Sequence, residues 1–444
     1  MKKGVQKRLL AISITVALCF GSFVTVFAAD MVSPLTVKIN VDGNASSLKA
    51  YSSSYENNNF ICLRDVAQAL NGTDKQFNVT YDKEKKAVNL IKGKPYVPVG
   101  NEGAGGNRKV QWASSSVAKL YVDGNPVKYN VYNVDGNTYI KFADIMQMFD
   151  LNAQMKNKAI IVDSSKGYTV NMDTLGKNGY FNFLNGAIVG NASTGEIIFS
   201  DKEDNKVAIA STTKIMTYLL VKEAIDSKKV SLDDEVILSK NAEAESVSED
   251  GVIPMKAGQT VKVSELLEGL LIVSSNECAT ALAEYVAGSE AKFVELMNKK
   301  ANELGLTSAE FYNPHGLPAF TEDVFTAKCQ NRMNAKDLFA LARYVINKYP
   351  EVLETVSKTE VNLESLKFSA LNTNRLLFNT SDVDGLKTGS TNRAGACLIA
   401  TTEVKNGDKT ERVISVILGA ELTAECAEKS SVLLQYAKQF YEKN

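Results

Sequence analysis

The sequence predicts an α+β fold, in which an antiparallel sheet carries helices on its faces and follows a small α+β repeat region. Apolar strand segments lie near both ends of residues 186–444, and a long helical region, about 210–350, separates them. A strand–helix–strand pattern also occurs twice across residues 31–165. Strands at both ends with helices between them favour a single sheet that buries its faces under helices.

The strands of the C-terminal sheet are predicted from apolar runs and a turn. Ser193-Thr194-Gly195 separates two short apolar segments, which is typical of a hairpin. Leucines and alanines at helical spacing mark the central region, where Gly305 ends one stripe. An amphipathic helix is expected around 432–440. The strands are expected at 187–189, 196–199, 396–400 and 413–418.

The N-terminal repeat is predicted from two similar units on either side of a glycine-rich stretch, 100–107. Asp65 and Asp144 occupy the same place in the two units, just after a strand. The glycines between the units follow no strand-to-helix pattern, so a phosphate-binding loop is rejected. The first unit is expected at 60–63, 64–70, 77–81 and 87–90, and the second at 139–142, 143–146 and 159–162.

The first residues resemble an export signal. Four basic residues precede an apolar stretch, 9–20, and Ala28 follows a plausible cleavage pattern. We therefore expect a signal peptide over residues 1–28 and an exported protein, extracellular or associated with the cell wall. The alternative is an uncleaved N-terminal membrane anchor, because the apolar stretch is nearly long enough to span a bilayer.

Charge and composition exclude several classes of function. The formal charge of −1 provides no basic field for nucleic acid. The six cysteines have no close spacing, which fits neither a disulfide framework nor a zinc site. A single histidine, His315, leaves no histidine cluster for a metal. No metal and no cofactor are expected.

Three short motifs carry the expected chemistry: Ser211-Thr212-Thr213-Lys214, Ser274-Ser275-Asn276 and Lys387-Thr388-Gly389. On a helix, Ser211 and Lys214 lie on one face. Ser211 would sit near the helix N-terminus, whose N–H groups stabilise a developing oxyanion. Burial and a second cation, Lys387, would lower the affinity of Lys214 for its proton, so it could serve as the base that activates Ser211.

The other two motifs supply proton relay and substrate contacts. Ser274 would pass protons between Lys214 and the leaving amine, and Asn276 would hold a substrate backbone carbonyl. Lys387-Thr388-Gly389 is expected at the start of an inner strand, where a cation and a hydroxyl could bind a free carboxylate. Each short motif is weak alone, and S-x-x-K recurs three times elsewhere, but their order and context favour a catalytic site.

Residues 186–440 resemble the serine-type D-alanyl-D-alanine carboxypeptidases, the low-molecular-mass penicillin-binding proteins. The phrases that carry the resemblance are ASTTKIMT, LLEGLLIVSSNECATALAE, FYNPHGLP and DGLKTGSTNRAG. The resemblance implies a penicillin-binding/β-lactamase-like transpeptidase fold and removal of the terminal D-alanine from peptidoglycan stem peptides, with β-lactams as covalent inhibitors. It makes Ser211 the acyl-enzyme nucleophile, Lys214 the general base, Ser274 the proton shuttle and Asn276 a substrate ligand. Lys387 and Thr388 would bind the carboxylate, beside Gly389, and the N–H groups of Ser211 and Ser390 would form the oxyanion hole.

Residues 31–165 resemble two copies of the copper amine oxidase N-terminal-like repeat, on the phrases LRDVAQALNG and YDKEKKAVNL. Nothing in them offers a copper site. The resemblance suggests a stalk or a module that contacts the cell wall, and an inert spacer is the alternative. Residues 166–185 are expected to be a linker and residues 186–444 the catalytic domain.

Two rival functions remain open. A class A-like β-lactamase shares the three motifs, but its deacylating glutamate in E-x-x-L-N is missing between Asn276 and Lys387. A non-catalytic cell-wall-binding protein would be favoured by a lost motif residue, and none is lost. Glu277 stands where the resembled family usually has aspartate. His315 is interpreted as a structural residue of a turn.

Overall fold

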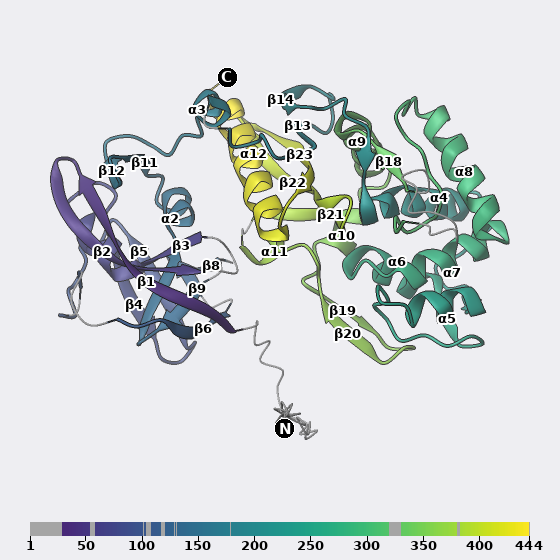
Figure 1. Cartoon of the computed structure of the whole chain (residues 1–444), viewed down its shortest axis with the longest axis horizontal. Coiled ribbons are helices and arrows are strands. Elements are labelled where there is room, and N and C mark those ends of the chain that lie inside the picture. Colours follow the sequence, from purple (N-terminus) through teal and green to yellow (C-terminus); the bar gives the residue numbers. More distant parts are fainter. Residues whose placement is uncertain are drawn as a thin grey trace, which may run out of the picture.

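The computed structural model describes residues 29–53, 58–100, 102–103, 108–116, 120–127, 129, 131–177, 179–318, 330–379 and 382–443. The expected export signal, 1–28, lies outside these residues. Within them, no helix combines the length and the apolar character needed to cross a membrane. Figure 1 shows a β-rich N-terminal body in purple and blue, and a larger body in green and yellow.

The N-terminal body contains two sheets. In the larger, the order is β11-β12-β1-β2-β3-β10-β9-β6, and a further pairing of β1 with β6 closes part of it into a ring. The smaller sheet has the order β4-β5-β7-β8. The strands are β1 (Ala29–Val41), β2 (Asn44–Ser53), β3 (Asn58–Cys62), β4 (Phe77–Asp82), β5 (Ala87–Lys92), β6 (Gln111–Ser116), β7 (Leu120–Val122), β8 (Asn125–Val127), β9 (Val131–Val134), β10 (Asn137–Lys141), β11 (Asn152–Lys156) and β12 (Ala159–Asp163).

Both halves of this body contain a strand that leads directly into a short helix, α1 (Leu63–Ala69) or α2 (Phe142–Met148). Asp65 and Asp144 are each the third residue of their helix. The buried Asp65 carboxylate accepts hydrogen bonds from the backbone N–H of Lys49 (2.6 Å) and of Gly103 (3.1 Å). Asp65 therefore holds α1 to the neighbouring backbone, which gives this acid a structural role.

The C-terminal sheet has the order β14-β13-β23-β22-β21 and is antiparallel throughout. Its strands are β13 (Gly186–Asn191), β14 (Ile197–Asp201), β21 (Val383–Thr391), β22 (Gly395–Asn406) and β23 (Lys409–Ala420). Helix α12 (Thr423–Lys443) packs on one face and α9 (Ala335–Lys348) on the other. Val189 faces the α12 side and Ile188 the opposite core, so both faces are buried. The predicted α+β class is confirmed.

The helical region is more interrupted than its leucine stripes indicate, because three pairs of short strands break or follow the helices. These pairs are β15 (Val207–Ala208) with β18 (Arg332–Met333), β16 (Glu235–Ile237) with β17 (Thr260–Lys262), and β19 (Glu360–Leu363) with β20 (Phe368–Leu371). The helices are α4 (Lys214–Asp226), α5 (Lys240–Ser246), α6 (Val263–Ile272), α7 (Asn276–Ala287), α8 (Glu290–Glu303), α10 (Val352–Val356) and α11 (Leu376–Asn379).

Two details differ from the sequence-based expectation. The segment expected to be a linker contains α3 (Met172–Lys177), and its Phe181 and Leu184 are buried in the core beneath α12. The strand that carries Lys387 is not an inner strand: β21 is the last in the sheet order and pairs with β22. Several of its residues, including Lys387, are nevertheless buried, because α10 and the turn that contains Ser211 pack against the strand.

Candidate active site

Ser211 lies in a single 3₁₀ turn, η1 (Ala210–Thr213), that leads directly into α4. The turn is anchored by Thr212, whose hydroxyl donates a 2.6 Å hydrogen bond to the carbonyl of Ile209. Helix α4 is buried along most of its length, since apolar side chains such as Ile215, Met216 and Leu219 point into the surrounding core. A buried helix holds the turn rigidly, so the partly exposed Ser211 is presented from a fixed base.

The amine of Lys214 is enclosed by three oxygen atoms. Its Nζ lies 2.8 Å from Ser211 Oγ, 2.8 Å from Asn276 Oδ1 and 2.8 Å from the carbonyl oxygen of His315. The amide oxygen and the carbonyl oxygen can only accept hydrogen bonds. A neutral amine must therefore donate both of its protons to them, which leaves its lone pair directed at Ser211.

Burial favours this neutral form of the Lys214 amine near neutral pH. Lys214 has no solvent exposure, and burial lowers its pKa to about 7 although the carboxylate of Glu277 acts in the opposite direction. Lys387 is also buried; burial and then the positive charge of Lys214 lower its pKa well below the usual value. The expected burial of Lys214 thus lowers its pKa, whereas repulsion between the two lysines acts on the pKa of Lys387.

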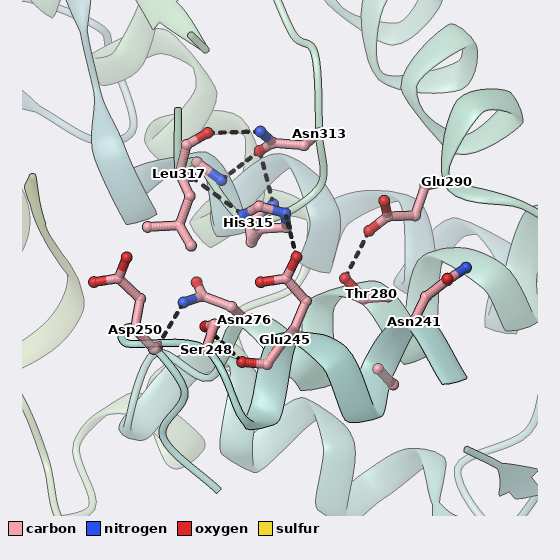
Figure 2. A network of polar contacts seen from close by, with 12 residues as sticks. Asn241, Glu245, Ser248, Asp250, Asn276, Thr280, Glu290, Asn313, His315 and Leu317 are labelled. Atoms are coloured by element: carbon pink, nitrogen blue, oxygen red, sulfur yellow. Dashed lines mark hydrogen bonds and ion pairs between the residues drawn. The ribbon is translucent and has the colours of Figure 1, made fainter. Parts of the chain in front are cut away.

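The second motif lies at the start of α7. Ser275 caps this helix by accepting a 2.9 Å hydrogen bond from the N–H of Cys278. Asn276 donates from Nδ2 to the carbonyl of Asp250 (3.0 Å; Figure 2), so its Oδ1 faces Lys214. Ser274 lies between α6 and α7 with a left-handed backbone, φ 63°, and it is not among the three hydrogen-bond partners of Lys214 described above.

The third motif lies on β21, against the Ser211 turn. A Cβ atom on Gly389 would be 2.9 Å from the backbone nitrogens of Ser211 and Thr212, so only glycine permits this approach. The Lys387 amine donates to the carbonyl of Thr388 (3.0 Å). The Thr388 hydroxyl lies 2.6 Å from that of Thr373. Ser390, next along the strand, is exposed.

Sequence reasoning missed several residues that hold the site. The buried amide of Asn331 donates to Thr213 Oγ1 (3.1 Å) and to the carbonyl of Asn313 (2.8 Å), and so joins the Ser211 turn to the Pro314-His315-Gly316 turn. Thr373 belongs to no motif either. The FYNPHGLP phrase marked the 314–316 turn, but nothing in the sequence marked Asn331.

His315 acts through its backbone as well as its ring. The ring Nδ1 accepts a hydrogen bond from the N–H of Leu317 (3.2 Å), and burial lowers the pKa of the imidazole to about 3 (Figure 2). The neutral ring therefore stabilises the turn, and the carbonyl of the same residue binds Lys214.

Replacement of Gly316 by alanine is expected to disrupt the site. Gly316 has φ +98°, and a Cβ atom would lie 2.0 Å from the carbonyl oxygen of Ala210, so both the backbone and the contact oppose the change. We expect a loss of several kcal/mol in unfolding free energy, at least about 3 kcal/mol. Gly288→Ala is the matched control, because Gly288 has φ +78° but no atom within 4 Å, and should lose only about 1–2 kcal/mol. Denaturant unfolding of both variants measures the difference, and equal losses would contradict the contact argument.

The fold and the Ser–Lys pair together define a penicillin-binding-type domain, and comparison with known proteins agrees. Residues 185–422 match the D-alanyl-D-alanine carboxypeptidase family, peptidase S11. The chain is 36% identical to D-alanyl-D-alanine carboxypeptidase DacF of Bacillus subtilis (strain 168) over 58% of this chain and 62% of that protein. The chain spans about three-fifths of the length of the first curated relatives that it matches.

Solved structures show the same relationship. A peptidoglycan synthesis regulatory factor (PBP3) from Streptococcus pneumoniae has a TM-score of 0.53 and 35% identity, covering 57% of this chain and 73% of that one. Penicillin binding protein 6B from Escherichia coli has a TM-score of 0.52 and 32% identity, covering 58% and 78%. The chain belongs to the D-alanyl-D-alanine carboxypeptidase family, peptidase S11, as the sequence motifs predicted.

Proposed function

We propose that the protein is an exported serine D-alanyl-D-alanine carboxypeptidase that removes the terminal D-alanine of peptidoglycan stem peptides. The observation that carries the proposal is the position of the Lys214 amine, 2.8 Å from Ser211 Oγ and from two oxygens that can only accept hydrogen bonds, so that its neutral form would direct the lone pair at Oγ. Family membership supports the same activity. β-Lactams would acylate the same serine.

Acylation follows from this geometry. Lys214 takes the Ser211 proton while Oγ attacks the carbonyl carbon of the penultimate D-alanine. The backbone N–H groups of Ser211 and Ser390 would stabilise the oxyanion. The C–N bond then breaks, and the leaving amine receives a proton that Ser274 would relay from Lys214. D-Alanine departs, and the shortened peptide stays on Ser211 as an ester.

Deacylation reverses the proton movements. Water loses a proton to Lys214 and attacks the ester carbonyl, and the bond from carbon to Ser211 Oγ breaks. The proton returns to Oγ, which restores the free serine. The protein supplies one base for both half-reactions, and no metal or cofactor enters either step.

The β21 edge suits a substrate that ends in a carboxylate. Lys387 and the Thr388 hydroxyl lie on this strand, and Gly389 lets it approach the Ser211 turn closely. A peptide placed along the free side of an edge strand can form backbone hydrogen bonds to it. We propose that Lys387 and Thr388 bind the terminal carboxylate and that Asn276 contacts a substrate carbonyl.

Incubation of the mature protein with a pentapeptide stem that ends in D-Ala-D-Ala tests the activity. Release of one D-alanine per peptide is expected, together with a stable penicillin adduct on Ser211. A stem that ends in D-Ala-L-Ala is the matched control and should release no amino acid. Rapid turnover of penicillin would instead support a β-lactamase, and the absence of both signals would support a non-catalytic wall-binding protein.

We further propose that residues 1–28 are an export signal and that residues 31–165 contact the cell wall, with a membrane anchor and an inert spacer as the alternatives. The basic and apolar pattern before Ala28 supports export. The strand–helix units around α1 and α2 support a likeness to copper amine oxidase N-terminal-like repeats. An extracytoplasmic location would place the enzyme beside its proposed substrate.

A further inference from the structure

Glu277 is the charged residue directly after Asn276, in the first turn of α7, and it is completely buried. Its Oε1 accepts hydrogen bonds from the backbone N–H of Val252 (3.1 Å) and of Ile253. Its Oε2 is buried and has no hydrogen-bond partner among the residues that the structure describes. A buried acid with one oxygen committed to backbone and the other unpaired calls for a reason beyond packing.

The backbone that Glu277 holds is the segment that orients Asn276. The carbonyl of Asp250 accepts from Asn276 Nδ2 (Figure 2), and Glu277 binds the segment two and three residues further on. Ser246 secures the same segment, since its hydroxyl donates to the carbonyl of Ile253 (2.7 Å). These contacts, two and three residues after Asp250, hold the segment that carries its carbonyl.

The orientation of the Asn276 amide decides what the Lys214 amine can do. With Nδ2 directed at Asp250, Oδ1 accepts one Lys214 proton, and the lone pair faces Ser211. In the flipped amide, Nδ2 would donate to the Lys214 lone pair. That lone pair would then be occupied and could not receive the Ser211 proton.

We propose that Glu277 is a positioning residue that fixes the Asn276 amide, and with it the direction of the Lys214 lone pair. The inference rests on the proposed function, because it requires Lys214 to be the general base. It assigns a role to the residue that departs from the aspartate usual in the resembled family.

The charges around Lys214 show in which direction Glu277 also shifts the pKa of this amine. Burial lowers the pKa of Lys214 to about 7, and Glu277 is the foremost of the charges that oppose this lowering. Removing the Glu277 charge should lower the pKa of Lys214 further, because the ammonium loses its strongest electrostatic support. The other titratable groups that act on Lys214 or are acted on by it are Glu245 on α5, Asp250, Cys278 on α7, His315 and Lys387 on β21.

The test is the rate of acylation by a fluorescent penicillin, measured on the full mature chain from about pH 5 to about pH 9. In the wild type the rate should rise with pH around 7, as Lys214 loses its proton. In Glu277→Gln the midpoint should fall by about one pH unit. The plateau rate should fall roughly threefold, because a base of lower pKa is weaker, while the glutamine oxygen can still accept from Val252 and Ile253.

Two further variants make the result decisive. Glu277→Asp keeps the charge but shortens the reach to Val252 and Ile253, so its midpoint should match the wild type while its plateau rate falls several-fold, roughly threefold or more. Glu290→Gln on α8 is the matched control: Glu290 is also largely buried and accepts from Thr280 (2.6 Å), and its profile should overlay the wild type.

The outcomes separate this inference from the proposed function. A wild type that forms no adduct at all would refute the proposed function itself. A reactive wild type with an unshifted Glu277→Gln midpoint, or with an equal shift in Glu290→Gln, would overturn only the role of Glu277. If Glu277→Gln does not fold, Glu277→Asp decides alone, and a wild-type plateau rate in that variant would overturn the inference.

Discussion

Ser211→Ala is expected to form no penicillin adduct and to release D-alanine at least roughly 10³-fold more slowly than the wild type. The substitution removes the hydroxyl oxygen that Lys214 is placed to deprotonate, the Oγ at 2.8 Å from its amine. Without that oxygen no ester can form, so the loss appears in the covalent step and not only in binding. Intact mass measured after incubation with penicillin checks the adduct directly.

Ser227→Ala is the matched control for this variant, because Ser227 lies at the other end of α4 and donates to the carbonyl of Ala224 (3.0 Å). It should be labelled as fast as the wild type. An adduct that persists in Ser211→Ala would place the nucleophile on another residue and would refute the proposed mechanism.

Lys214→Met is expected to lower the acylation rate by about 10²–10⁴-fold, the usual contribution of a positioned base. Methionine fills much of the same buried volume but has no lone pair for the Ser211 proton. Two opposing effects act on the fold. Removal of the buried amine removes its desolvation cost, which is stabilising. Two acceptors, Asn276 Oδ1 and the His315 carbonyl, lose a donor, which is destabilising, so the fold should survive. We expect the melting temperature to change by only about 5 °C, since these effects oppose each other.

Lys222→Met is the control for the lysine change. Lys222 lies on the same helix, and its amine forms a 2.8 Å ion pair with Glu351, away from Ser211. Its acylation rate should equal that of the wild type. Stopped-flow labelling of both variants is the measurement, and a Lys214→Met protein that reacts at a normal rate would show that another group is the base.

The sequence predicted the local parts of the site better than its long-range contacts. Ser211 and Lys214 are three residues apart, so helical geometry alone places their side chains together. The other two partners of Lys214 are 62 and 101 residues further along the chain. Periodicity does not encode such contacts: the motif marked Asn276 as a substrate contact, and its contact with Lys214 was not predicted. The His315 carbonyl is a backbone atom, and side-chain chemistry gave no sign of it.

The fold was likewise predicted better in its local parts than in its long-range contacts. The hairpin of β13 and β14 was predictable because apolar strands flank a turn, whereas the two-residue strands β15 and β18 have too few residues for a pattern. The expectation of an inner strand at Lys387 was wrong, since burial of a residue such as Leu386 comes from helix and turn contacts rather than from a second neighbouring strand. The apolar residues of a strand indicate that it is buried, but they do not show whether another strand, a helix or a turn covers it.

The paired hydroxyls of Thr373 and Thr388 have a consequence for how an anion would be received. Each hydroxyl has one proton, and Thr373 can direct its own to the carbonyl of Ile272 (3.3 Å) or to Thr388 (2.6 Å). A carboxylate arriving at Thr388 would select the second arrangement, in which Thr373 donates to Thr388 and Thr388 donates to the anion. Only the two O–H bonds would have to rotate for this arrangement to form. The two hydroxyls are therefore preorganised for a carboxylate, and no heavy atom has to move when it binds.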